Sequence, residues 1–165
     1  MSTKRLFLVL GIIALTAVSG IASQSADHGL RFEARLTGAR EVPPVVTNTS
    51  GRAEFKVNSA RTEIQFELKI SKATDILAAA GAHIHCGAKG VNGPIVAFLA
   101  GPVTGGFDGK VEIEATLTQA NITNTACGAT ISALVQSMLH GNAYVNAHSA
   151  AHPGGEIRGQ IELDD

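Results

Sequence analysis

The chain has 165 residues, with 13 basic and 14 acidic side chains and a net charge of −1 at neutral pH. Lys and Arg are scattered singly and only 4% of the residues are aromatic, so the basic stripe with interleaved aromatics that is typical of nucleic-acid-binding proteins is missing. This composition excludes a nucleic-acid partner. The length and the 45% hydrophobic content suit one domain with a substantial core.

The N-terminus has the pattern of an export signal. Lys4 and Arg5 precede an unbroken apolar run over residues 6–15, and small residues follow. Polar and small residues dilute the segment before it reaches the roughly 20 apolar residues that a membrane-spanning helix needs. We therefore expect residues 1–22 to be a signal peptide that is cleaved after Ala22. An uncleaved anchor is the alternative.

Cleavage defines the expected domain organisation. The remaining 143 residues carry 11 basic and 14 acidic side chains, a net charge of −3. Residues 23–29 are expected to form a short linker, and residues 30–165 one β-domain without a second membrane segment. We expect a secreted, extracellular protein, periplasmic where the host has an outer membrane, that has no membrane contact after cleavage.

Apolar and polar side chains alternate along most of this domain, as they do in half-buried strands. Between residues 30 and 36, for example, Phe32 and Leu36 lie on one face and Glu33 on the other. Alternation and short apolar runs predict strands over residues 30–36, 52–57, 62–70, 82–86, 94–99, 110–117, 143–148 and 157–163. Turns of Gly, Pro and Asn separate them, among them a predicted hairpin turn at Asn92 and Gly93. The expected fold is all-β, an antiparallel β-sandwich or Greek-key barrel.

One segment has the period of a helix instead. The apolar residues between about 129 and 140 fall at helical spacing, with Thr130 near the start and Gly141 past the end. We expect one short helix here, packed across an open end of the β-structure. Its apolar stripe is interpreted as part of the core.

Two cysteines, Cys86 and Cys127, lie in the part of the chain expected to be exported into an oxidising environment. A disulfide between them is predicted, and closing a loop of this length stabilises a fold by about 4 kcal/mol. The alternative is a free thiol that binds metal, because Cys86 is next to His85.

The motifs of common enzyme classes are missing: there is no G-x-S-x-G, P-loop, H-E-x-x-H or dinucleotide-binding sequence. Glu112 and Glu114 lie on the polar face of an alternating strand, where solvated charges are the ordinary outcome. The sequence therefore favours a protein that is not an enzyme.

The histidines form the most informative set. His83 and His85 flank Ile84 in a predicted strand, so both rings project from one face, about 7 Å apart. In the predicted strand at 143–148, His148 lies on the polar face. If the two strands are neighbours, the three rings converge, and His152 in the following turn is a candidate fourth ligand.

Imidazole ligands without a nearby carboxylate favour copper or zinc. The alternative interpretation is a set of hydrogen-bonded or solvated histidines, because a metal site also needs convergent geometry.

Five blocks resemble the CHRD domain family, which takes its name from chordin, a secreted antagonist of growth factors, and includes many exported microbial proteins. In order, they are LTGAREVPPV (36–45), AHIHCGA (82–88), NGPIV (92–96), GNAYVNAH (141–148) and HPGGEIRGQI (152–161). The resemblance covers nearly all of the domain. It implies an extracellular β-domain and brings no established catalytic activity.

A second likeness is local. Residues 81–87, GAHIHCG, are similar to the metal-binding strand of copper/zinc superoxide dismutases, which are also β-sandwiches with one disulfide. The bridging histidine and the zinc-binding Asp of those enzymes have no recognisable counterpart here. A simpler mononuclear site is the remaining hypothesis.

Two further segments have alternative interpretations. The prolines of residues 41–45 either protect a sheet edge or offer a polyproline segment to a partner. Glu156 and Arg158 are expected to pair on a solvent face, or to hold the turn that contains His152.

The sequence leads to three hypotheses. The first is a non-enzymatic extracellular binding module for an unidentified extracellular protein or surface ligand. The second is a mononuclear copper or zinc protein that serves storage, electron transfer or superoxide dismutation. The third is a structural surface protein stabilised by its disulfide.

Overall fold

A computed structural model describes residues 29–164, so the predicted signal peptide lies outside the described residues. The described chain forms nine strands, one α-helix and two short 3-10 helices. The strands are β1 (Arg31–Thr37), β2 (Ser50–Val57), β3 (Ile64–Ile76), β4 (Ala82–Cys86), β5 (Ile95–Ala100), β6 (Phe107–Leu117), β7 (Ala143–Ala147), β8 (Ile157–Gln160) and β9 (Glu162–Leu163). The helices are η1 (Gly38–Arg40), η2 (Gln119–Asn121) and α1 (Ile131–Leu139).

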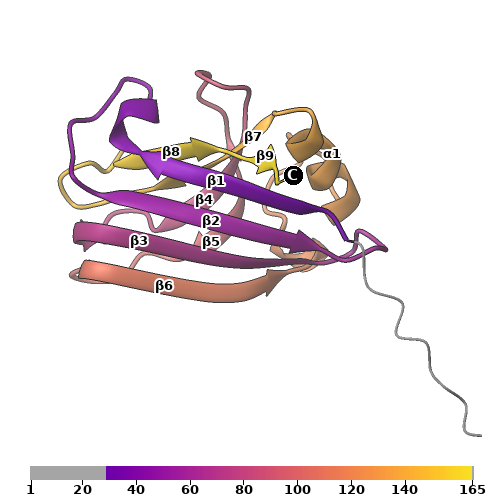
Figure 1. The fold of residues 1–165 in the computed structure, drawn as a ribbon, viewed down its shortest axis with the longest axis horizontal. Helices are drawn as coiled ribbons and strands as arrows, with labels where there is room; N and C mark the ends of the chain where they lie inside the picture. The colour runs from indigo at the N-terminus through magenta and orange to yellow at the C-terminus, as the bar shows by residue number, and fades with distance from the viewer. Residues whose placement is uncertain (1–28, 165) are drawn as a thin grey trace, which may run out of the picture.

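All strands belong to one antiparallel sheet, in the order β5-β4-β7-β8-β1-β2-β3-β6, with β9 beside β1. Figure 1 shows β1, β2, β3 and β6 as a front layer, with β4, β5 and β7 behind it. Isolated bridges from Ile76 to Ser149 and from Ala97 to Ile122 link the two layers. The sheet therefore rolls into a nearly closed barrel, which confirms the predicted all-β antiparallel fold.

Period-two alternation explains the core. The inward positions of β1, β2 and β3 carry large apolar side chains that are almost fully buried, among them Phe32, Leu36, Phe55, Ile64 and Leu68. Burying each such side chain contributes roughly 1.5–3 kcal/mol. The core fills the interior of the barrel, and the outer faces of the strands are not part of it.

The predicted disulfide is present. Cys86, at the end of β4, is bonded to Cys127, with a Cα–Cα distance of 5.5 Å. Both sulfurs are therefore oxidised, and the alternative of Cys86 as a thiolate metal ligand is wrong. The bond ties β4 to the segment that leads into α1.

Helix α1 begins and ends as its sequence predicts. The hydroxyl oxygen of Thr130 accepts a hydrogen bond from the Ala133 N–H at 3.1 Å, and Gly141 follows the helix with a φ of 68°. The apolar stripe is buried, and the helix contacts β7 and β9 at one end of the barrel (Figure 1). Within residues 29–164, no helix is long and apolar enough to span a membrane.

Three local predictions differ from the structure. Strand β3 continues to Ile76 instead of ending at residue 70, because bulges interrupt its alternation while its pairing with β6 continues. The C-terminal strand is divided into β8 and β9. The turn between β4 and β5 lies at residues 88–91, with Gly90 at a φ of 78°, and not at Asn92 and Gly93.

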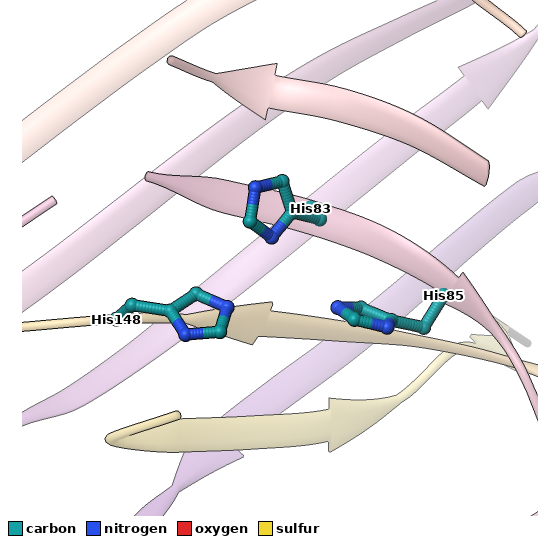
Figure 2. A group of neighbouring side chains, drawn as sticks. All are labelled: His83, His85 and His148. Atoms are coloured by element: carbon teal, nitrogen blue, oxygen red, sulfur yellow. The ribbon is translucent and has the colours of Figure 1, made fainter. Parts of the chain in front are cut away.

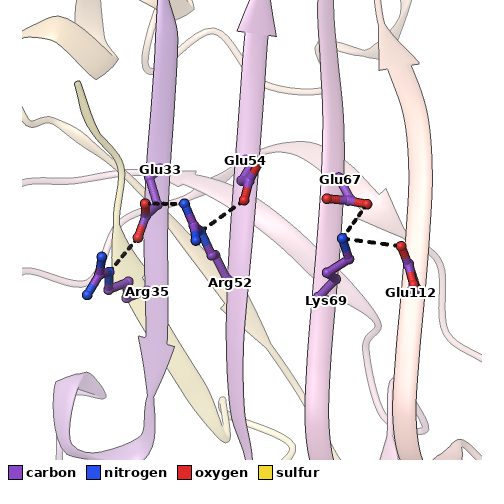
Figure 3. A network of polar contacts seen from close by, with 7 residues as sticks. All are labelled: Glu33, Arg35, Arg52, Glu54, Glu67, Lys69 and Glu112. Carbon is purple, nitrogen blue, oxygen red and sulfur yellow. Dashed lines mark hydrogen bonds and ion pairs between the residues drawn. The ribbon is translucent and has the colours of Figure 1, made fainter. Parts of the chain in front are cut away.

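The outer face of β1, β2, β3 and β6 is covered with charge pairs (Figure 3), formed by Glu33, Arg35, Arg52, Glu54, Glu67, Lys69 and Glu112. The Arg52 Nη2 lies 2.7 Å from a Glu33 carboxylate oxygen, and the side chain of Arg52 is 49% exposed. Glu112 is a solvated member of this surface, as predicted. Exposed pairs of this kind contribute only about 0–1 kcal/mol each.

Candidate metal centre

The outer face of β4 and β7 carries polar side chains, in contrast to their apolar inner face. The two strands are neighbours, and their pairing places His83 opposite Asn146 and His85 opposite Tyr144. Ile84 and Val145, on the other face, belong to the core. The adjacency on which the histidine hypothesis depended is therefore present.

Three of the four candidate ligands come together. One ring nitrogen from each of His83, His85 and His148 lies within 4.8 Å of the other two, and Figure 2 shows the rings converging. His83 is 1% exposed and His148 is 6% exposed. His152 does not join them: its side chain lines a different hollow, with Thr47 and other residues of the neighbouring loops.

Hydrogen bonds fix the tautomer and the orientation of two of the rings. The Nδ1 of His85 donates to the Gly93 carbonyl oxygen at 2.9 Å, and the Nδ1 of His148 donates to the Pro153 carbonyl oxygen at 2.9 Å. A carbonyl oxygen only accepts, so the ring proton is on Nδ1 and the lone pair is on Nε2.

The remaining ring nitrogens of the group have no partner among the described residues. They are the Nε2 atoms of His85 and His148 and both ring nitrogens of His83. Buried polar atoms are nearly always hydrogen-bonded, so such a concentration of unpaired nitrogens needs an explanation. Imidazoles that donate through one nitrogen to a carbonyl and offer the other are the usual form of metal-ligating histidine.

The environment keeps the three rings neutral. Burial, together with the neighbouring His148 and His85, lowers the pKa of His83 to about 4. Burial also lowers the pKa of His85 and of His148. At neutral pH all three rings are therefore in the unprotonated form that binds metal ions.

A stack of side chains supports His85 from the outer side of the sheet. The Tyr144 ring lies parallel to the His85 ring, with centroids 4.8 Å apart, and the Arg158 guanidinium lies 3.4 Å from the Tyr144 centroid. Arg158 donates to the Asn92 side-chain oxygen and to the Val91 carbonyl oxygen, both at 2.8 Å. The planar guanidinium thereby joins the β4–β5 loop to the candidate site.

The predicted solvent-exposed pair of Glu156 and Arg158 is therefore wrong. Both side chains are buried, at 4% and 2% exposure, and a carboxylate oxygen of Glu156 accepts a hydrogen bond from the Thr47 hydroxyl at 2.8 Å. Loops cover this face of the sheet and exclude the solvent that an outward-facing pair was expected to meet.

The sequence did not predict that Glu41 belongs to the group of buried polar side chains on this outer face of the sheet. One of its carboxylate oxygens accepts a hydrogen bond from the Asn146 amide at 2.7 Å, and the residue is 6% exposed. Burial raises the pKa of Glu41 to about 7, against the opposing charge of Arg158. The available signal was that Glu41, Asn92 and Arg158 are polar residues inside the blocks that resemble the CHRD family.

Opposing titrations of His83 and Glu41 predict the pH dependence of stability in the metal-free protein. The pKa of His83 falls from 6.5 to about 4 on folding, so its contribution is complete above pH 6.5 and is lost as the pH falls toward 4. The pKa of Glu41 rises from 4.5 to about 7, so its contribution is complete below pH 4.5 and is lost as the pH rises toward 7. Each contribution is on the order of 3 kcal/mol.

Glu41→Gln removes the contribution that falls with rising pH. Between pH 4.5 and 6.5, the free energy of unfolding of this variant should therefore rise more than that of the wild type, by roughly 2 kcal/mol. Urea denaturation in the presence of a chelator measures both profiles. Glu114→Gln, at an exposed position, should follow the wild type. Parallel profiles for Glu41→Gln and the wild type would contradict the assignment.

Comparison with known proteins gives one family. The family model for the CHRD domain matches residues 32–161. No curated protein matches the chain. The matched range contains the three convergent histidines, both cysteines and Arg158.

Proposed function

The chain belongs to the CHRD domain family, and we propose that it is an exported member that binds one copper or zinc ion through His83, His85 and His148. The observation that carries this proposal is the convergence of buried ring nitrogens without hydrogen-bond partners. The cysteine pair and the N-terminal sequence pattern support the proposed export.

The chemistry of the donor set supports copper or zinc. The group consists of neutral imidazoles, which suit these metals, whereas Mg²⁺ and Ca²⁺ prefer oxygen ligands. His83, His85 and His148 would hold the ion, and the carbonyl groups of Gly93 and Pro153 orient two of the rings. Storage, electron transfer and superoxide dismutation are the roles that assays of the metal-loaded protein would separate.

The test is the metal content of mature protein from its native host, followed by copper and zinc titration of the metal-free form. We expect near-stoichiometric metal in the wild type. The His83→Ala/His85→Ala variant should lose this metal because it keeps only one ligand of the group. His140→Ala, which alters an exposed histidine after α1, should bind as the wild type does. Only weak uptake by the wild type, or equal uptake by the double variant, would contradict the proposal.

The family membership favours a second candidate function, a non-enzymatic binding module for an extracellular protein or surface ligand. In this case, the His83→Ala/His85→Ala variant should keep its fold and bind its partner as tightly as the wild type does. Comparing the two proteins for both metal and partner binding separates the candidates.

A further inference from the structure

We propose that the site formed by His83, His85 and His148 holds copper in the cuprous state, Cu⁺, in preference to Zn²⁺ and Cu²⁺. This inference rests on the proposed metal-binding function and names the ion that the site selects. Three properties of the site support it: the number of its ligands, its shielding from solvent and the charge of its surroundings.

The number of ligands favours Cu⁺. Within residues 29–164, the group contains three imidazoles and neither a carboxylate nor a thiolate. Zn²⁺ in proteins takes a fourth ligand, and Cu²⁺ prefers tetragonal coordination. Cu⁺ is stable with a lower coordination number. The Tyr144 hydroxyl already has a partner in the β4–β5 loop, because it accepts a hydrogen bond from the Gly93 N–H at 3.2 Å.

Aromatic side chains shield the site from water, which would otherwise complete the coordination of a divalent ion. His83 is 1% exposed, and the Phe98 ring meets its ring edge-on, with centroids 4.5 Å apart and an interplanar angle of 89°. The Tyr144 ring stacks on His85. Phe98 lies on β5 at the edge of the sheet and is itself 44% exposed, so it separates His83 from solvent.

The charge of the surroundings also favours the monovalent ion. The buried carboxylates of the described chain, Glu41 and Glu156, already accept hydrogen bonds from Asn146 and Thr47. The Arg158 guanidinium adds positive charge behind the Tyr144 ring. Because the cost of removing an ion from water rises with the square of its charge, a divalent ion costs roughly four times as much as a monovalent one in the same buried site.

The experiment is a titration of the metal-free full-length mature protein with Cu⁺ under anaerobic conditions, in competition with a chromogenic Cu⁺ chelator. Parallel competition titrations use Zn²⁺ and Cu²⁺. We expect one equivalent of Cu⁺, bound at least 100-fold more tightly than either divalent ion. A preference of about 100-fold over Cu²⁺ raises the reduction potential of bound copper by about 120 mV relative to the aqueous couple.

Two phenylalanine variants test the role of shielding. Phe98→Ala opens His83 to water and should reduce the preference for Cu⁺ over Zn²⁺ about tenfold, a typical effect of residues behind the ligands. Phe107→Ala is a matched control, because Phe107 is also 44% exposed but lies on β6, at the other end of the strand order. It should keep the wild-type preference. Equal ratios in the two variants would overturn the role given to Phe98.

The outcomes separate this inference from the function on which it rests. If Zn²⁺ or Cu²⁺ binds as tightly as Cu⁺ and is lost in His83→Ala, the preference for Cu⁺ is overturned and the metal-binding function stands. If the wild type takes up none of the three ions stoichiometrically, both are overturned. Stoichiometric Cu⁺, bound more tightly than the divalent ions and lost in His83→Ala, supports both.

Discussion

Replacing Cys86 and Cys127 together by serine should lower the free energy of unfolding by about 4 kcal/mol. The disulfide spans a sequence separation of 41, so its removal gives the unfolded chain much more conformational freedom. Because native domains are stabilised by only about 5–15 kcal/mol in total, this loss is a large fraction of the stability. The bond also begins at the residue that follows His85, so it anchors the end of the strand that carries two candidate ligands.

Equilibrium denaturation in urea measures this effect, with the oxidised wild type and the double serine variant compared at pH 7. A reducing agent should lower the denaturation midpoint of the wild type toward that of the variant and leave the variant unchanged. Coincident curves for the oxidised wild type and the variant would show that the bond does not contribute to stability.

The barrel was largely predictable because its core depends on local alternation. Phe32 and Leu36 are four positions apart, so they lie on the same face of β1, and each is buried as the pattern predicts. Strand β3 shows where this signal ends, because bulges shift its register after Ile70 while pairing with β6 continues. A bulge changes the face on which later side chains lie, and alternation alone cannot place it.

The candidate site was predictable only in part. The facing of His83, His85 and His148 followed from the alternation of their strands, and the pairing of β4 with β7 completed the group. His152 lies outside this group because it lies in a turn, where no strand period fixes the direction of its side chain. That two strands about 60 residues apart are neighbours is a property of the whole sheet, which local patterns do not determine.

Arg158 and Glu156 show the main limit of the sequence patterns. In an antiparallel sheet, the face opposite the core is usually solvated, so these residues were assigned to the surface. Here the loops after β1 and β4 cover the outer face of the sheet, and Asn92 donates to the Val42 carbonyl oxygen at 2.8 Å to join those loops. A second buried layer results. It is polar, and alternation does not distinguish it from a surface.

This second layer leads to the other large expected effect. Arg158→Met keeps the unbranched apolar stem but removes the guanidinium, and it should lower the free energy of unfolding by about 3 kcal/mol or more. The Asn92 side-chain oxygen and the Val91 carbonyl oxygen each lose a charge-assisted donor, in hydrogen bonds that are partly buried. The pKa of Glu41 should rise further, because Arg158 is the charge that lowers it.

Arg52→Met is the matched control for this variant, because it removes the same group from an exposed pair on the front layer of the barrel. Its expected loss is about 0–1 kcal/mol. Arg158→Lys separates charge from shape: an ammonium group retains the charge but lacks the planar fork that lies over Tyr144 and reaches two acceptors. We expect Arg158→Lys to resemble Arg158→Met in urea denaturation at pH 7. Equal stability of Arg158→Met and Arg52→Met would show that the loops hold the outer layer without the guanidinium.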